Sequence, residues 1–365
     1  MHKQQCGIAA LSTAVLVLSG ALPRPGAHAA VTPPAPALAY VANGQVAVIE
    51  AGNLTVAGTG QNPLWAPNAS SLLFDAPDMM AGNMIISVAD QHGANAHVIV
   101  SRANPAVNPS WSPDSQYVLY TIAAPGAKAK GPMVTLQVRA MRLATGATKT
   151  LGTFTFAGGC SLASSALQAA FAQAQGSYLG APSTLIWAQP ATVVVQSSCT
   201  GQGLTLLKVG GGAVQTLKGW SGGVLSPDGK SVVASAGGGK VGIIAVASRS
   251  TKVLAPKLSP GSLVWLPNSK QVFTISQPVN PATGMVSVVR FSPDGKTTST
   301  LGSVRAAAGF HLSLNHLGDH LVMALVASGS PKVGAPPAVS VVDVPALSPG
   351  VPTPIIAGGQ PAWRP

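Results

Sequence analysis

The sequence predicts an all-β fold, a single β-propeller of seven four-stranded blades. A short phrase recurs along the chain, hairpin-like strand pairs recur between its copies, and the composition suits a β protein with many turns. Of the 365 residues, 47% are hydrophobic and 8% are charged, and the chain contains 41 Gly and 31 Pro. This hydrophobic content is enough to bury a core, which a disordered chain lacks.

The recurring phrase is a large apolar anchor, a turn rich in Pro, Asn, Asp, Ser or Gly, and then an apolar strand. Trp111-Ser-Pro-Asp and Leu225-Ser-Pro-Asp-Gly are its clearest copies. Pro presets φ, and Gly and Asn tolerate positive φ, so each copy predicts a tight turn. The apolar run behind the turn predicts a strand buried between neighbouring sheets. The seven anchors are Trp65, Trp111, Trp187, Leu225, Trp265, Leu314 and Trp363.

The spacing of the anchors predicts the number of blades. Successive anchors are 46, 76, 38, 40, 49 and 49 residues apart, and a period of about 40 to 50 residues is typical of propellers. Seven hairpin-like pairs lie between them, which gives the same count, although six and eight blades stay open. An extra copy of the turn at Phe291-Ser-Pro-Asp-Gly follows Trp265 by only 26 residues and is assigned to a hairpin within a blade. Six anchors are followed seven positions later by an apolar strand residue: Leu72, Val118, Val194, Val232, Val272 and Leu321.

The two ends of the repeat predict how the ring closes. No strand follows Trp363, whereas Ala37-Leu-Ala-Tyr-Val41 has the pattern of a strand. We therefore expect one blade to combine strands from both termini, so that no sheet edge is left exposed. The 76-residue gap before Trp187 is expected to hold a small helical or loop insertion at about 157–183, in the fourth blade, because that stretch is rich in Ala.

Residues 1–30 are predicted to be a signal peptide. Lys3 precedes an apolar stretch over 8–22, and Ala27-His-Ala-Ala30 supplies small residues for cleavage. A Pro-rich lead over 31–37 and a propeller over 38–365 follow. A transmembrane anchor is the alternative, but about 15 apolar residues are short for a span. We expect an exported protein, periplasmic or on the cell surface, with no membrane-spanning segment after cleavage.

Cleavage would leave two cysteines, Cys160 and Cys199. Two thiols in an oxidising compartment usually pair, so a disulfide that ties the insertion to its blade is expected. Two buried free thiols are the alternative.

The Trp-Ser-Pro-Asp turn followed by a strand resembles the TolB-like family of WD40-like propellers, over nearly all of the expected mature chain. The resemblance implies an exported bacterial propeller of the cell envelope that serves mainly as an interaction scaffold. Only about eight residues separate the expected cleavage site from the first strand, so the α/β domain that precedes the propeller in the family's periplasmic member has no counterpart here. Its role is therefore not carried over. Gly219-Trp-Ser221-Gly-Gly223 fits the Gly-x-Ser-x-Gly string of hydrolases, but we interpret it as a Gly-rich loop between blades.

Acidic residues are scarce, since the chain has one Glu and eight Asp. Three of them, Asp114, Asp228 and Asp294, are assigned to turns, which leaves few pairs for acid–base chemistry or a hard-cation cage. The one dense constellation is His311, His316, Asp319 and His320, whose ligand types suit Zn or Cu. These residues replace turn positions of the sixth anchor, where exposed polar residues are ordinary. We therefore assign no catalytic residue, cofactor or metal.

The charge is unevenly distributed. Residues 31–101 carry four acids and no Lys or Arg, a net of −4, while residues 102–365 carry 19 basic residues and five acids, a net of +14. The bland interpretation is solubility, and the sharper hypothesis is that the basic sector binds a protein or an anionic envelope component. Nucleic acid is disfavoured because the chain has few aromatics and no dense Lys/Arg run. The first hypothesis is a monomeric, non-enzymatic scaffold, and the alternative is a lyase or hydrolase with a tunnel site around His311, His316 and His320.

Overall fold

Strands make up all the regular secondary structure in the described part of the chain. The computed structural model describes residues 37–78, 81, 83–104, 108–125, 133–157, 183–188, 192–197, 204–208, 215–236, 240–254, 260–276, 284–315, 318–327, 339–346, 350, 353–357 and 359–364. The expected signal peptide, most of the expected insertion, Cys160, Cys199 and His316 lie outside these residues. Pro36–Pro365 form one compact unit, and no helix in the described residues is long and apolar enough to cross a membrane.

The described strands form seven four-stranded antiparallel sheets. The first four sheets along the chain contain β28 (Gly359–Trp363), β1 (Ala37–Ala42), β2 (Gln45–Glu50) and β3 (Asn53–Thr59); β4 (Gln61–Trp65), β5 (Ser71–Asp78), β6 (Asn83–Asp90) and β7 (His97–Ala103); β8 (Ser110–Trp111), β9 (Tyr117–Ala123), β10 (Met133–Arg142) and β11 (Thr148–Ala157); and β12 (Ser183–Ala188), β13 (Thr192–Ser197), β14 (Leu204–Lys208) and β15 (Gln215–Leu217). The other three contain β16 (Trp220–Leu225), β17 (Ser231–Ala236), β18 (Lys240–Ala245) and β19 (Thr251–Leu254); β20 (Pro260–Trp265), β21 (Val272–Ser276), β22 (Met285–Phe291) and β23 (Thr298–Arg305); and β24 (Ala308–Leu314), β25 (His320–Val326), β26 (Val339–Pro345) and β27 (Thr353–Ala357).

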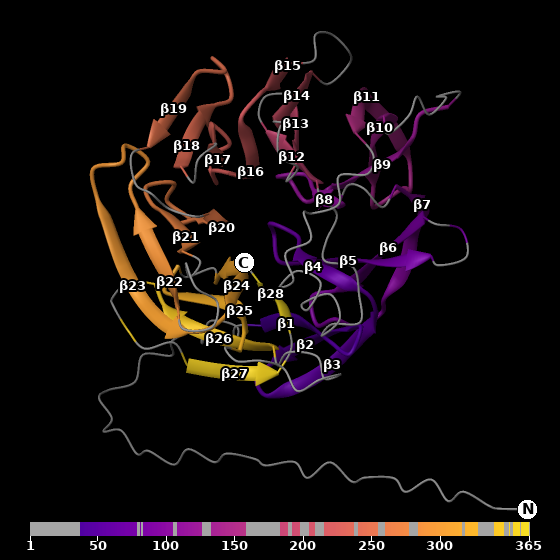
Figure 1. Cartoon of the computed structure of the whole chain (residues 1–365). Helices are drawn as coiled ribbons and strands as arrows, with labels where there is room; N and C mark the ends of the chain where they lie inside the picture. Colours follow the sequence, from indigo (N-terminus) through magenta and orange to yellow (C-terminus); the bar gives the residue numbers. More distant parts are fainter. Residues whose placement is uncertain are drawn as a thin grey trace, which may run out of the picture. The chain divides into compact units, whose positions relative to one another are not determined.

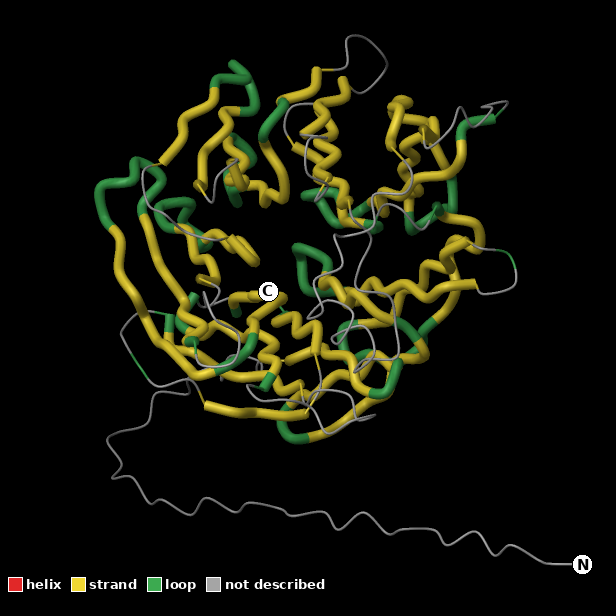
Figure 2. The backbone as a smooth tube through the Cα atoms, in the orientation of Figure 1, coloured by secondary structure: helices red, strands yellow, loops and turns green. Residues whose placement is uncertain are grey.

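Each sheet of this unit contacts the next along the chain, and the sheet of β24–β27 contacts the sheet of β28 and β1–β3. The sheets therefore follow one another around a ring, with β4, β8, β12, β16, β20, β24 and β28 on the inside (Figure 1). Figure 2 shows strands joined by turns and loops throughout the ring. This is a propeller arrangement.

The anchors end the innermost strands, and most of them face the residue that the repeat spacing predicts. Trp65 pairs with Leu72 and Trp111 with Val118. The same seven-residue offset holds for Leu225, Trp265 and Leu314. Trp187 is an exception, because it pairs with Val193 and not with Val194. Val194 lies in β13 as expected, but β12 and β13 pair one residue closer to the turn than in the other copies.

The Ser-Pro-Asp motif closes its turn with a fixed set of hydrogen bonds. Ser112 Oγ donates to Asp114 Oδ1 at 2.5 Å and accepts the backbone N–H of Tyr117 at 2.9 Å. Asp114 Oδ1 also accepts the N–H of Gln116 at 3.1 Å. The turns at 226–231 and 292–297 repeat all three bonds. The turn at 292–297 joins β22 to β23, as expected for the extra copy, so the motif specifies the turn and not its place in the sheet.

Tryptophan side chains connect neighbouring sheets through one recurring contact. Trp111 Nε1 donates to the carbonyl oxygen of Leu64 at 2.9 Å, and Trp265 Nε1 donates to that of Val224 at 2.9 Å. Each acceptor immediately precedes the anchor of the previous sheet. Both indoles are buried, so their polar atoms need partners inside the protein.

Strands from both ends of the chain share one sheet, as predicted. β1 pairs with β28, with Leu38 opposite Trp363 and Ala39 opposite Ala362. The apolar residues of this sheet pack against the next one, where Ala39 and Val48 share a buried cluster with Trp65, Leu72 and Phe74.

The Gly-x-Ser-x-Gly string is not a loop, so that interpretation was wrong. Trp220 to Gly223 belong to β16, with an irregularity in the pairing between Ser221 and Gly223. Trp220 is buried and packs over Gly242 of β18, where an added Cβ would collide with the indole ring and with the Lys252 carbonyl oxygen. Burial of the indole holds this segment in the sheet, which explains why the glycine-rich composition was misleading.

Candidate functional sites

Of the four residues in the histidine constellation, Asp319 and His320 have described side chains. His320 starts β25, and its Nδ1 lies 2.9 Å from Asp343 Oδ2 on β26, with 47% of the His320 side chain exposed. Asp319 instead accepts the Asn315 Nδ2 hydrogen bond at 2.7 Å within the turn. His311 belongs to β24, and His316 lies outside the described residues. No group of three His, Cys, Asp or Glu side chains suited to a metal occurs within the described ranges.

All nine acidic residues of the chain lie within the described ranges, and eight of them have hydrogen-bond or ion-pair partners, seven at turns or strand ends and Asp343 within β26. Their carboxylates accept hydrogen bonds from backbone N–H groups or side chains, or pair with histidine. These eight are Glu50, Asp78, Asp90, Asp114, Asp228, Asp294, Asp319 and Asp343. The turn positions expected for Asp114, Asp228 and Asp294 are confirmed.

The ninth carboxylate, that of Asp75, is buried in the sheet of β4–β7, with 1% of the residue exposed. It faces the sheet of β8–β11, because Leu73 and Ile86 on the same face pack in a cluster with Trp111 and Val118. Asn62 Nδ2 donates to its two oxygens at 3.1 and 3.4 Å, and lies 3.4 Å from Asn108 Oδ1. Burial raises the pKa of Asp75 to about 7, and the side-chain amides of Asn62 and Gln61 beside the carboxylate offset this only in part.

The local backbone shapes the surroundings of Asp75. Gln61 lies directly opposite Asp75, and the β4–β5 register shifts between Gln61 and Leu64. Asn62, at this irregularity, has a φ of 53°, a conformation that Asn tolerates better than most residues. Sequence reasoning did not single out this site. The available signal was an Asp inside the apolar run Leu72-Leu-Phe-Asp75, where a carboxylate is unexpected.

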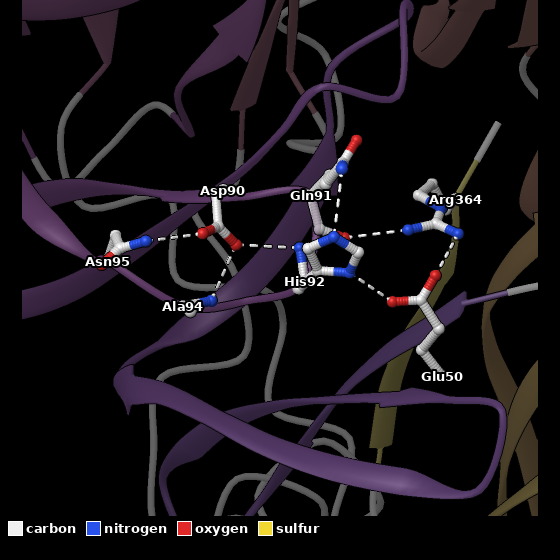
Figure 3. A network of polar contacts seen from close by, with 7 residues as sticks. All are labelled: Glu50, Asp90, Gln91, His92, Ala94, Asn95 and Arg364. Atoms are coloured by element: carbon white, nitrogen blue, oxygen red, sulfur yellow. Dashed lines mark hydrogen bonds and ion pairs between the residues drawn. The ribbon is translucent and has the colours of Figure 1, made fainter.

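A second polar network lies where the two ends of the chain meet (Figure 3). Arg364 Nη2 donates to Glu50 Oε1 at 2.5 Å, and Arg364 Nη1 donates to the Gln91 carbonyl oxygen at 2.9 Å. His92 Nδ1 lies 2.5 Å from Glu50 Oε2. Burial acts to raise the pKa of Glu50, but His92 and Arg364 outweigh it and hold that pKa below its ordinary value.

This network joins three sheet segments. Glu50 ends β2, Gln91 and His92 follow β6, and Arg364 follows β28. The Arg364 guanidinium carbon also lies 5.9 Å from the centre of a Trp65 ring, within reach of a cation–π contact. Arg364 is largely buried, so we interpret the network as a structural connection across the closure of the ring.

Basic side chains gather on one end of two adjacent sheets, which we call the basic turn cluster: Lys230, Arg249, Lys252, Lys270 and Lys296. All five are exposed and lie in or beside the turns of β16–β19 and β20–β23. Two contacts hold these turns together: the Asp228 N–H donates to Ser269 Oγ at 3.2 Å, and Lys252 Nζ lies 3.4 Å from the Asp294 carbonyl oxygen. With Asp228 and Asp294 included, five positive and two negative charges leave a net of +3.

No family model matches the chain, and no curated protein matches its sequence. Among solved structures, oligogalacturonate lyase from Vibrio parahaemolyticus is similar with a TM-score of 0.55 and 10% identity, over 83% of this chain and 83% of that one. A Bacteroides uniformis protein, provisionally named a 6-phosphogluconolactonase, has a TM-score of 0.54 and 10% identity, over 90% and 98% of the two chains. TolB from Acinetobacter baumannii has a TM-score of 0.47 and 18% identity, over 90% and 67%. At 10% identity, the likeness to the first two structures concerns the fold alone.

Proposed function

We propose that this chain is an exported, non-enzymatic propeller of the TolB-like type, with seven blades, that binds an acidic protein or an anionic envelope polymer. The observation that carries the proposal is the basic turn cluster. It places five exposed cations on adjacent turns, while the nearby carboxylates of Asp228 and Asp294 are already hydrogen-bonded within their own turns. The seven sheets and their cyclic contacts support the blade count.

Electrostatics favour an anionic partner for this surface. Exposed charges attract an oppositely charged polymer over about one Debye length, roughly 8–10 Å at ordinary ionic strength. Neighbouring sheets bring these cations together, so a polyanion contacts several of them at once. The turns that carry Lys230 and Lys296 are stiffened by the Ser-Pro-Asp bonds, which lowers the entropy lost on binding.

Binding to an immobilised anionic polysaccharide, with neutral dextran as the comparison, tests the proposal. The wild-type protein is expected to bind the anionic matrix alone, and added salt is expected to release it. A K230Q/K252Q/K270Q variant should elute at lower salt. The matched control is R102Q/K218Q/K240Q, which removes three exposed charges outside the cluster and should elute close to the wild type. Equal elution of both variants, or binding that salt leaves unchanged, would refute the proposal.

The second candidate is a propeller enzyme of lyase or hydrolase type, with a tunnel site around His311, His316 and His320. The names of two similar structures suggest this class of reaction. The His320–Asp343 pair gives it little support, because 47% of the His320 side chain is exposed and the pair does not lie in a buried site. Metal analysis of the wild type and of an H316A/H320A variant tests this candidate, and stoichiometric metal lost in the variant would favour it over the scaffold.

A further inference from the structure

The Asp75 carboxylate lies in surroundings that neutralise it poorly. Within the described residues no Lys or Arg forms an ion pair with it, and only two neutral amides, those of Asn62 and Gln61, lie beside its oxygens. A carboxylate with 1% exposure is costly unless it is paired, hydrogen-bonded or bound to a metal. Asp75 therefore calls for a further partner or for a proton.

A second buried side chain points to the same need. Gln61 is 1% exposed, and its amide lies beside Asp75, but within the described structure neither its Oε1 nor its Nε2 forms a hydrogen bond of good geometry. Gln61 and Asp75 are directly opposed on neighbouring strands, so their side chains lie on the same face of the sheet. Buried amide groups in native proteins nearly always have partners, which include ordered water and ions.

The oxygens near Asp75 come from separate segments. Asn62 Nδ2 lies between the two Asp75 oxygens and Asn108 Oδ1, with two of these three distances at 3.4 Å. The Asn108 amide oxygen and the Asp75 carboxylate, which belong to adjacent sheets, therefore both lie within hydrogen-bond reach of one amide nitrogen. The Asp75 carboxylate and the amide oxygens of Gln61 and Asn108 together form an oxygen-only set of side chains. Hard cations prefer such a set, which contains no sulfur or imidazole.

We propose that Asp75, Gln61 and Asn108 form a binding site for a hard divalent cation of the Ca²⁺ type, at the junction of the sheets β4–β7 and β8–β11. The cation neutralises the buried carboxylate and gives the Gln61 amide oxygen a partner. The Asn62 amide, now a donor to Asp75, turns its oxygen toward the cation. With a single charged ligand the site binds weakly, with a Kd on the order of 10⁻⁴ to 10⁻³ M. Ca²⁺ fits better than Mg²⁺ because it accepts irregular oxygen sets.

Thermal unfolding of the full chain, stripped with a chelator and then dialysed, tests the site with CaCl₂ as the probe. At about ten times the Kd, Ca²⁺ is expected to raise the Tm of the wild type by about 2–4 °C. Asp75→Asn keeps the shape of the side chain and should abolish the shift, and Gln61→Leu should reduce it. The matched control is Asp78→Asn, which removes a carboxylate from the same strand and should retain the full shift.

A Ca²⁺ shift that is absent from the wild type, or is equally large in Asp75→Asn, overturns the proposal. Mg²⁺ at equal ionic strength should raise the Tm less, and an equal rise would mean a general charge effect and would also overturn it. If Asp75→Asn does not fold, direct Ca²⁺ titration by calorimetry of the wild type and Gln61→Leu decides, with a several-fold weaker Kd expected in the variant.

Discussion

Trp65 Nε1 donates a hydrogen bond to the carbonyl oxygen of Ala362 at 3.0 Å, which joins residues 297 positions apart. Ala362 precedes the last anchor, Trp363, so this contact is the same one that Trp111 makes with Leu64 and Trp265 makes with Val224. The C-terminal strand β28 is therefore connected to the sheet of β4–β7 by the same contact that connects other neighbouring sheets in the ring.

Replacing Trp65 by Phe should lower the free energy of unfolding by about 1–3 kcal/mol, because it leaves the Ala362 carbonyl oxygen without this donor and removes part of a buried ring. Denaturant unfolding measures the loss. Trp111→Phe serves as the comparison, since it removes the same bond inside the ring. A Trp65→Phe protein as stable as the wild type would show that the indole bond does not stabilise the closure.

Removing the Arg364 guanidinium should destabilise the protein. Arg364→Met keeps much of the side-chain volume and leaves Glu50 without its cation, with an expected cost of about 2 kcal/mol in unfolding free energy. In a double-mutant cycle, the Arg364→Met/Glu50→Gln variant should lose less unfolding free energy than the two single variants lose together, because the Glu50→Gln substitution leaves no unpaired charge. The control, Lys296→Met, breaks an exposed pair with Asp294 and should leave the unfolding free energy nearly unchanged, because solvent screens that pair. Equal effects of the two single variants would contradict a structural role for the closure network.

The buried Asp75 carboxyl should make stability depend on pH in a chelator-containing buffer. Its pKa is raised from 3.8 to about 7, so the folded state keeps a proton that the unfolded chain releases. Stability from this group is therefore fully present below about pH 4 and is lost as the pH rises toward 7, by on the order of 4 kcal/mol. Asp75→Asn should flatten that decline, and the difference between the two pH profiles isolates it. Parallel profiles would show that the pKa of Asp75 is near its ordinary value.

Ser115 should stabilise the contact between two neighbouring turns. It has a φ of 60°, a position that Gly occupies in the turns at Gly229 and Gly295, and its Oγ accepts the Asn68 N–H at 3.0 Å. Ser115→Ala keeps the strained φ and loses this bond, so a loss of about 1 kcal/mol is expected. Ser115→Gly loses the bond but relieves the strain, so its loss should be smaller. A Ser115→Gly variant that is less stable in urea unfolding than Ser115→Ala would show that the positive φ of residue 115 is not strained.

The sequence predicted the propeller arrangement because the repeat is local. Each Ser-Pro-Asp turn closes through bonds within six residues, so the turn and the strand behind it can be found in the sequence. The sheet shared by β1 and β28 could also be predicted, because the last anchor has no strand after it and the strand pattern at 37–41 has no anchor before it. Periodicity could not predict the register at Trp187, where the pairing is one residue shorter, or the strand at Trp220, which depends on a distant contact with Gly242.

The candidate sites were harder to predict, since they depend on contacts between distant segments. Arg364 and Glu50 are 314 positions apart, and Asn62 and Asn108 belong to different sheets. His320 and Asp319 were both assigned to an exposed turn, and the pairing of His320 with Asp343 on the neighbouring strand β26 could not be found from their spacing. In an apolar strand, the lone Asp75 was the only local sign of the buried site.

The pairing of β1 with β28 makes the ends of the described ring neighbours, and the Arg364 N–H donates to the Ala37 carbonyl oxygen at 2.9 Å. The bond from Trp65 to Ala362 on β28 also repeats the bonds between other neighbouring sheets. The ring therefore has no obligatory starting point in its fold. A short linker that joins these two ends would allow the chain to be opened at an exposed turn, such as that of Ser248 and Arg249, and the order of the strands would change while their neighbours stayed the same.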